Sequence, residues 1–339
     1  MITPVDFSFV SAKLHGMRSK LYEGARLDAL TTLRNPFEMM SAVFPATDLR
    51  DRYGFEQRLV EQHVHDLNRI CVLLEGANRA FFDWQIERYR IENVKTLLRA
   101  WKARELVVDA RSMIARLPDA LALDVDGLLS APGLADFTRL LPGRLYTEGV
   151  RRGAVQYHDT NHLFFIEAGL DAVYFEELCR RAAALSKADR AEVETLVGLE
   201  VRIYDVLFAL RGRLNLGLSA EAVGDFLVTD VGAAPDSVSL EPVLAAEDFA
   251  GMLAALPQRR MLPSGEPQDI AAVQRALHEH LGRAANRAFY RSMFGMGVVE
   301  GFYYVKRVEL ANLIRACELL RQERPGADIA RELLRVGGS

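Results

Sequence analysis

The chain has 339 residues, of which 50% are apolar and 26% are charged, and its formal net charge is −4. This composition permits large buried cores and excludes a disordered chain, and the length is sufficient for two or three domains. No long run of basic residues is present, which argues against a protein that binds nucleic acid through its phosphates.

The N-terminus and the cysteines indicate the compartment. The N-terminus lacks the basic start, apolar run and small-residue cleavage site of a signal peptide, and no uninterrupted apolar stretch approaches the length of about 18 residues that suggests a membrane span. Cys71, Cys179 and Cys317 are too few and too widely spaced for a disulfide framework or a metal site. We therefore expect a soluble protein of the cytoplasmic type, with each cysteine buried as a small hydrophobe.

Helical periodicity dominates the chain from end to end. Apolar residues recur at three- and four-residue intervals in residues 55–74, 170–185 and 270–293, and this spacing predicts amphipathic helices. Ser186 followed by Asp189 predicts a capped helix start. The alternation typical of strands is hard to find, so we predict an all-α fold. Breaks with Gly or Pro are expected at residues 117–119, 132–133, 142–143, 232–236, 257 and 263–267.

Three segments of the chain share one helical pattern. Aligned on Arg99, Arg211 and Arg315, each has a polar residue six positions earlier and apolar residues five positions and one position earlier. The steps between the arginines are 112 and 104 residues, each the size of a small domain. The aligned sets are Asn93, Asp205 and Glu309; Val94, Val206 and Leu310; and Leu98, Leu210 and Ile314.

A second pattern repeats upstream of each of these segments, and we call it the cassette. Its three apolar positions fall on one stripe of a helix, and a Pro directly after the third position ends that helix. Two patterns in the same order three times favour a triplicated chain over chance similarity among helices, and we predict three helical domains, residues 1–116, 117–218 and 219–339. The cassettes are Phe37, Met40, Phe44 and Pro45; Leu134, Phe137, Leu141 and Pro142; and Phe249, Met252, Leu256 and Pro257.

The common motifs of catalysis and cofactor binding are absent from the sequence. It contains no phosphate-binding loop, no nucleophile elbow and no zinc-protease or paired-cysteine motif. The glycine-rich residues 295–301 lie between two helical patterns, which favours close helix packing or a turn over a dinucleotide site. We therefore predict no catalytic residue and no cofactor.

The histidines give little support to a metal site. Two pairs lie two residues apart, on different faces of a helix, so they cannot chelate one metal locally, and we expect them at the surface. His158, Asp159 and His162 could bind a metal, but a capped helix start around Asp159 or Thr160 is the favoured interpretation. We predict no metal. The two pairs are His63 with His65 and His278 with His280.

The repeated arginines are the candidate interface residues. On a helix Arg99 shares its face with charged residues, so we expect it to face solvent. The same face around Arg211 is apolar, which predicts a charge that emerges from a buried or partner-covered surface and pairs with an acidic group of the fold or of a partner. Arg315 is intermediate. The neighbours are Glu92, Lys95 and Lys102 for Arg99, and Tyr204, Leu207, Phe208 and Leu214 for Arg211.

Residues 164–214 contain Glu167, Leu170, Asp171 and Tyr174, followed by Ile203, Val206 and Arg211. This pattern resembles the central-stalk C subunit of V/A-type rotary ATPases, which is called the d subunit in eukaryotes. That family shows an "E..LD..Y" helix and, about thirty residues later, "iDi.Nl...lR". Residues 92–100 and 309–316 look like the corresponding helices of a first and a third domain, and the N-terminal residues are similar to the family's opening helices. The matching residues are Glu167, Leu170, Asp171 and Tyr174, then Ile203, Val206 and Arg211, with Asp205 where the family usually has Asn.

The resemblance implies a function without catalysis. It implies three similar helical domains arranged pseudo-threefold as a funnel, which sits on the membrane-embedded proteolipid ring and receives the central shaft. The chain would then be a peripheral component on the cytoplasmic side of the membrane, and a monomer when isolated. The alternatives are a free-standing helical-repeat scaffold that binds partner helices, and an all-α enzyme with a site near His158, Asp159 and His162.

Overall fold

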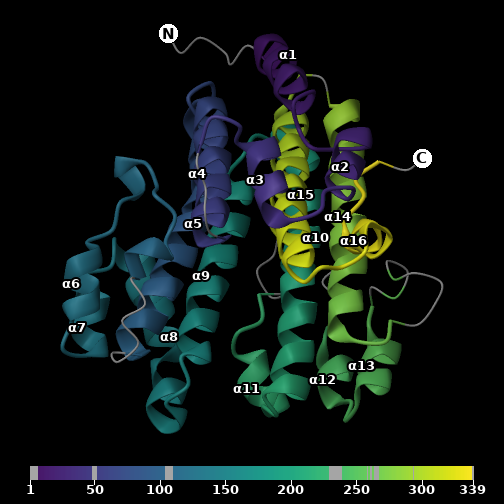
Figure 1. The fold of residues 1–339 in the computed structure, drawn as a ribbon. Coiled ribbons are helices and arrows are strands. Elements are labelled where there is room, and N and C mark those ends of the chain that lie inside the picture. Colours follow the sequence, from purple (N-terminus) through teal and green to yellow (C-terminus); the bar gives the residue numbers. More distant parts are fainter. Residues whose placement is uncertain are drawn as a thin grey trace. The chain divides into compact units, whose positions relative to one another are not determined.

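The computed structural model describes residues 7–47, 52–103, 110–228, 239–257, 259, 262, 267–292 and 294–337. Within these residues all regular structure is helical and no strand occurs, which confirms the predicted all-α fold (Figure 1). The chain forms two compact units. Unit 1 comprises Met1–Ser19, Phe175–Val308 and Leu334–Ser339, and unit 2 comprises Lys20–Tyr174 and Glu309–Leu333.

Unit 1 is built around long helices from the middle of the chain. Here α10 packs on α14, and α1 lies against the end of α14, where the ring of His15 is 4.5 Å from that of Phe289. The helices of this unit are α1 (Phe7–Arg18), α10 (Lys187–Leu210) with a π-helical turn (Arg211–Asn215), α11 (Ala220–Gly224), α12 (Glu241–Ala245), α13 (Phe249–Ala255) and α14 (Ile270–Arg291).

Unit 2 combines the first half of the chain with the end of the last long helix. Two helices pass from one unit to the other, α9 (Phe164–Ala183) and α15 (Met296–Arg321). The remaining elements of unit 2 are α2 (Ala25–Leu30), α3 (Pro36–Val43), α4 (Arg52–Cys71), α5 (Gly76–Ala103), η1 (Ala110–Ser112), η2 (Asp119–Leu121), α6 (Val125–Ser130), α7 (Leu134–Arg139), α8 (Arg144–Thr160) and α16 (Gly326–Glu332).

The sequence periodicity located these helices well. The three predicted amphipathic segments correspond to α4, α9 and α14, and the Ser186 Oγ accepts from the Asp189 N–H (3.1 Å) at the start of α10. The cassettes form α3, α7 and α13, which each end before the Pro, and their middle residues Met40, Phe137 and Met252 are buried. The break predicted at 232–236 lies outside the described residues, as does all of 263–267 except Pro267.

Glycines allow two pairs of helices to cross in close contact. In unit 2 a Cβ on Gly153 of α8 would lie 2.0 Å from the Phe165 carbonyl oxygen of α9. In unit 1 a Cβ on Gly301 of α15 would lie 2.6 Å from the Phe289 backbone nitrogen of α14. The glycine-rich residues therefore serve close helix packing, as predicted. They also admit a cap, because the Gly297 N–H donates to the Glu192 carboxylate (2.8 Å) at the start of α15.

Two sequence expectations for polar residues were wrong. His63 is buried, not at the surface, and shares a hydrogen bond of 2.6 Å with the Tyr89 hydroxyl, because it falls on the face of α4 that packs on α5. Asp159 and Thr160 end α8 instead of starting a helix. Asn161 follows in the left-handed conformation (φ 60°), which closes the helix without Gly or Pro.

The cysteines are all buried and free, as expected. Burial, assisted by a hydrogen bond from the thiol to Asp83 (2.8 Å), raises the pKa of Cys71 to about 12. Burial likewise raises the pKa of Cys179 to about 12. Among the helices of the described residues, none combines the length and the apolar composition needed to cross a membrane.

Candidate functional site

The three repeated arginines lie at the C-terminal parts of the long helices α5, α10 and α15, and all three are exposed. Arg99 lies in α5 and Arg315 in α15, whereas Arg211 begins the π-helical turn that follows α10. Their exposure agrees with the expectation for Arg99. The contacts of the three side chains differ, and they decide which charge is available to a partner.

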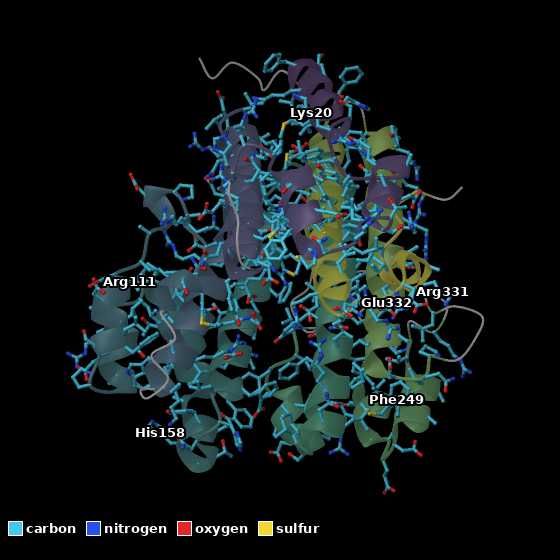
Figure 2. All side chains as sticks on the ribbon, in the orientation of Figure 1. Lys20, Arg111, His158, Phe249, Arg331 and Glu332 are labelled. Atoms are coloured by element: carbon cyan, nitrogen blue, oxygen red, sulfur yellow. The ribbon has the colours of Figure 1, made fainter. Side chains whose placement is uncertain are left out.

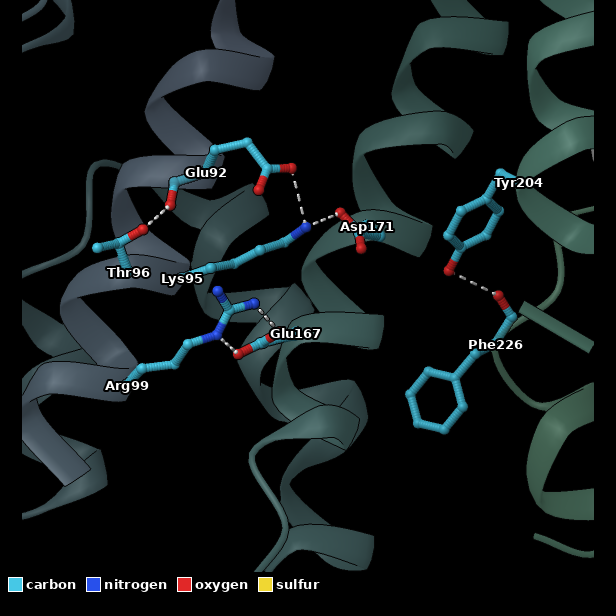
Figure 3. Close-up of polar contacts among 8 residues, drawn as sticks. All are labelled: Glu92, Lys95, Thr96, Arg99, Glu167, Asp171, Tyr204 and Phe226. Atoms are coloured by element: carbon cyan, nitrogen blue, oxygen red, sulfur yellow. Dashed lines mark hydrogen bonds and ion pairs between the residues drawn. The ribbon is translucent and has the colours of Figure 1, made fainter. Parts of the chain in front are cut away.

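Arg99 belongs to a charged seam between α5 and α9 (Figure 3). Its Nε and Nη2 donate to the two carboxylate oxygens of Glu167 at 2.7 and 2.5 Å. One turn earlier the buried Lys95 donates to Glu92 (3.1 Å) and to Asp171. Burial alone would lower the pKa of Lys95, but the two carboxylates outweigh it and raise the pKa above its ordinary value. Burial raises the pKa of its partner Asp171 above the ordinary value as well. The charge of Arg99 is already paired with Glu167.

Arg211 has a neutral partner. Its Nη2 donates to the Gln274 side-chain oxygen of α14 (2.7 Å), and no ion pair to it is present in the described part of the chain. The predicted acidic partner is thus not supplied by the described fold, and an acidic group of another protein stays a prediction. The π-helical turn, closed by the Leu216 N–H donating to the Arg211 carbonyl (3.2 Å), leaves Leu216 itself 49% exposed. An exposed cation and an exposed apolar side chain therefore end this helix together.

Arg315 resembles Arg99. Its Nη2 donates to the Glu332 carboxylate of α16 at 2.8 Å, and the side chain is 48% exposed. Glu332 is labelled in Figure 2 beside Arg331. An exposed ion pair of this kind contributes little to stability, about 0–1 kcal/mol.

The polar residue six positions before each arginine makes an equivalent buried contact. The Asn93 side chain accepts from the Ala115 N–H (3.1 Å), Asp205 from Val228 (2.9 Å), and Glu309 from Tyr22 (2.8 Å). All three side chains are buried. The sequence pattern shows that these positions are similar but does not indicate their role. The one feature of the sequence that could have indicated this role is a polar residue on an otherwise apolar stripe of the helix.

The sequence's other candidate cluster is at the surface. His158, Asp159 and His162 are all exposed, at the end of α8 and just before α9. His158 is labelled in Figure 2. No group of three or more His, Cys, Asp or Glu residues that could hold a metal occurs among the described residues.

Comparison with known proteins assigns the chain to a family. The family model described as ATP synthase (C/AC39) subunit matches residues 10–332. The chain belongs to this family. Three relatives, each named as the C subunit of an A-type ATP synthase, agree with the assignment. The protein of Methanosphaera stadtmanae is 22% identical, over 78% of this chain and 70% of the relative.

Two further relatives show the same level of similarity. The protein of Methanothermobacter thermautotrophicus is 24% identical over the same shares, 78% and 70%. That of Methanobrevibacter smithii is 21% identical over 89% of this chain and 81% of the relative. The resemblance found at residues 164–214 thus extends over nearly the whole chain.

Proposed function

We propose that this chain is a non-catalytic central-stalk component of a V-type (A-type) ion-translocating ATPase or ATP synthase, and that it couples the rotor shaft to the membrane ring of proteolipid subunits. The match to the ATP synthase (C/AC39) subunit family over residues 10–332 carries the proposal. The names of the three relatives support the same complex. A part with this role binds two partners and transmits torque, and it needs no active site or cofactor of its own.

The proposed arrangement follows from the sequence repeats and the family resemblance. Three similar helical domains, predicted at residues 1–116, 117–218 and 219–339, would surround a pseudo-threefold axis as a funnel. The chain would be attached to the cytoplasmic face of the membrane through the ring, and it would be monomeric when isolated. We expect no nucleic-acid partner.

The packing suits transmission of torque. A part that transmits torque must resist deformation, and close-packed interiors have low compressibility. In unit 2 the glycine crossing of α8 and α9 brings two backbones into direct contact, and Lys95 joins α5 to α9 through Asp171. In unit 1 the buried carboxylate of Glu200 on α10 accepts from the Tyr304 hydroxyl of α15 (2.6 Å). Such contacts fix neighbouring helices against sliding.

Arg211 is the residue most suited to contact a partner. Arg99 and Arg315 already pair with carboxylates, whereas the side-chain partner of Arg211 in the described part of the chain is the neutral Gln274. A carboxylate of the shaft or the ring would gain a charge-assisted hydrogen bond there. We expect Arg211→Ala to weaken binding by about fivefold or more, since such bonds contribute more than 1 kcal/mol, and the exposed Arg99→Ala and Arg315→Ala to change it by less than about twofold.

The test is a bridging assay. The purified chain is mixed with the shaft proteins and the detergent-solubilised proteolipid ring, and capture of the ring by an immobilised shaft is measured with and without it. Capture should require the chain, and the isolated chain should show no ATP hydrolysis. Capture that is equally efficient without the chain would disprove the proposal. Equal capture by the Arg211→Ala and Arg99→Ala variants would disprove only the role of Arg211.

A further inference from the structure

The cassette helix of residues 134–141 packs on the long helix that precedes it in the chain. In unit 2, α6 packs on α5, and α7 packs on both α6 and α8. The Trp101 indole of α5 donates to the Ala131 carbonyl between the two short helices (2.8 Å), and its ring lies 5.5 Å from that of Phe137. The Asn93 contact to Ala115 joins the same helix to the segment that leads to α6. The cassette of Phe137 therefore belongs with the helix of Arg99.

Unit 1 repeats this order. After α10 the chain forms α11, α12 and α13, and each of these packs on the element before it. The Asp205 carboxylate accepts from the Val228 N–H (2.9 Å), and the ring of Phe208 lies 6.0 Å from that of Phe226. Met252 in the cassette helix α13 is fully buried. A long helix is again followed by short helices, of which α11 packs on it, α12 on α11 and α13 on α12.

The third long helix, α15, is covered by short helices from the opposite end of the chain. Glu309 accepts from the Tyr22 N–H (2.8 Å), 287 residues away in sequence. The short helices α2 and α3 lie beside the C-terminal half of α15 and share one core with it (Figure 1). That core includes Leu27, Leu30, Met39 and Met40 from the N-terminal segment, Leu313, Ala316, Cys317 and Leu320 from α15, and Phe55 and Leu59 from α4.

We propose that the chain is a circularly permuted triple repeat, in which residues 20–44 are the displaced C-terminal part of the third module. The first module is the C-terminal half of α5 with residues 110–141, and the second is the C-terminal half of α10 with α11, α12 and α13. The third is α15 from Glu309 onward with residues 20–44. This grouping crosses the boundaries predicted at residues 116 and 218. It does not depend on the proposed function.

The grouping gives the N-terminal segment a conformational role. Leu27, Leu30 and Met39 share their buried core with α15, which is synthesised long after them. The third module therefore closes only after α15 has been synthesised, when residues 20–44 can pack against it. Detachment of residues 20–44 exposes the end of α15 and leaves the first module intact. This holds although the cassette of residues 37–45 is closer in sequence to α5 than to α15.

Hydrogen exchange in full-length variants separates the two groupings. Met40→Ala, Phe137→Ala and Met252→Ala each remove a buried side chain at the equivalent position of a cassette, and local opening then speeds amide exchange in the elements packed on it. We expect exchange at least about tenfold faster in residues 309–321 for Met40→Ala, in 93–103 for Phe137→Ala, and in α12 and then α11 for Met252→Ala. Met40→Leu, which conserves volume, should leave exchange near that of the parent.

The opposite pattern would overturn the proposal. If each cassette belonged with the long helix that follows it, Met40→Ala would act on α5, Phe137→Ala on α10 and Met252→Ala on α15. A second variant covers the case in which Met40→Ala unfolds the whole chain. Glu309→Ala removes the acceptor of the Tyr22 N–H and should speed exchange in residues 22–44 by about fivefold. Unchanged exchange there would also refute the proposal.

Discussion

The substitution Gly153→Ala tests the packing of unit 2 at its closest crossing. A Cβ at this position would lie 2.0 Å from the Phe165 carbonyl oxygen, 2.4 Å from its carbonyl carbon and 2.7 Å from the Ile166 nitrogen. All three are backbone atoms, so no side-chain rotation relieves the clash. The two helices must separate by about 1 Å or more to restore van der Waals contact, and atoms along the whole crossing then lose dispersion contacts.

The expected cost is at the upper end of the range for overpacking, about 3 kcal/mol, and the melting temperature should fall by about 6–12 °C. Far-UV circular dichroism during thermal and urea unfolding measures both quantities. Gly16→Ala in α1 is the control, because a Cβ there meets no atom within 4 Å, and the better helix propensity of Ala should stabilise by about 0.5–1 kcal/mol. If both variants behave alike, the close approach of α8 and α9 is not real.

A second variant shows whether the clash is between the helices. Gly169→Ala on α9 would place its Cβ 2.1 Å from the Gly149 carbonyl oxygen of α8, at the same crossing. Once one alanine has forced the helices apart, the second meets less resistance. The double variant should therefore cost less than the sum of the single variants, by about 1 kcal/mol or more. Strict additivity would mean that the two glycines act in separate places.

Two other predictions concern buried charge and buried thiols. Lys95→Met should destabilise unit 2 by about 2 kcal/mol in urea unfolding, because Asp171 and Glu92 lose their shared cation. Arg99 is more exposed, so Arg99→Ala should cost less than about 1 kcal/mol. Equal losses of stability would contradict the burial of Lys95. The folded-state pKa of Cys71 and of Cys179 is raised from 9.0 to about 12, so their contribution to stability is complete below about pH 9 and is lost as the pH rises toward 12. Cys71→Ala should make stability fall less steeply over that range, and neither thiol should be alkylated in the folded protein at neutral pH; modification without unfolding would contradict this.

Local patterns in the sequence predicted most of the helices. The periodicity of residues 55–74 and 270–293 reports which face is buried, and a Pro after each cassette marks where the helix stops. These are properties of neighbouring residues. The close helix packing at the glycines of residues 295–301 was also predictable. Glycine within a helical pattern lowers stability, so its presence there indicates that another element approaches closely.

Pairings between distant segments could not be predicted in this way. The order of the cassettes suggested that each one accompanies the arginine helix after it, whereas α3 shares its core with α15 and α7 lies against Trp101 of α5. The end of α8 was missed because Asn161 adopts a left-handed conformation that is most often assigned to glycine. The burial of His63 depends on Tyr89, which lies on another helix.

The contrast between two repeated positions bears on the proposed interface. Asn93, Asp205 and Glu309 differ in chemistry yet make the same contact, because losing the acceptor would leave a buried N–H unpaired at a cost of about 1–3 kcal/mol. The arginines are identical in chemistry, yet their partners in the fold are two carboxylates and one amide, in exposed contacts that contribute little to stability. The fold therefore accounts for the buried position and gives no reason for three identical arginines. A surface that contacts a partner in each module would explain why the three residues are identical. The binding assay that compares Arg211→Ala with Arg99→Ala and Arg315→Ala is therefore a direct test of function.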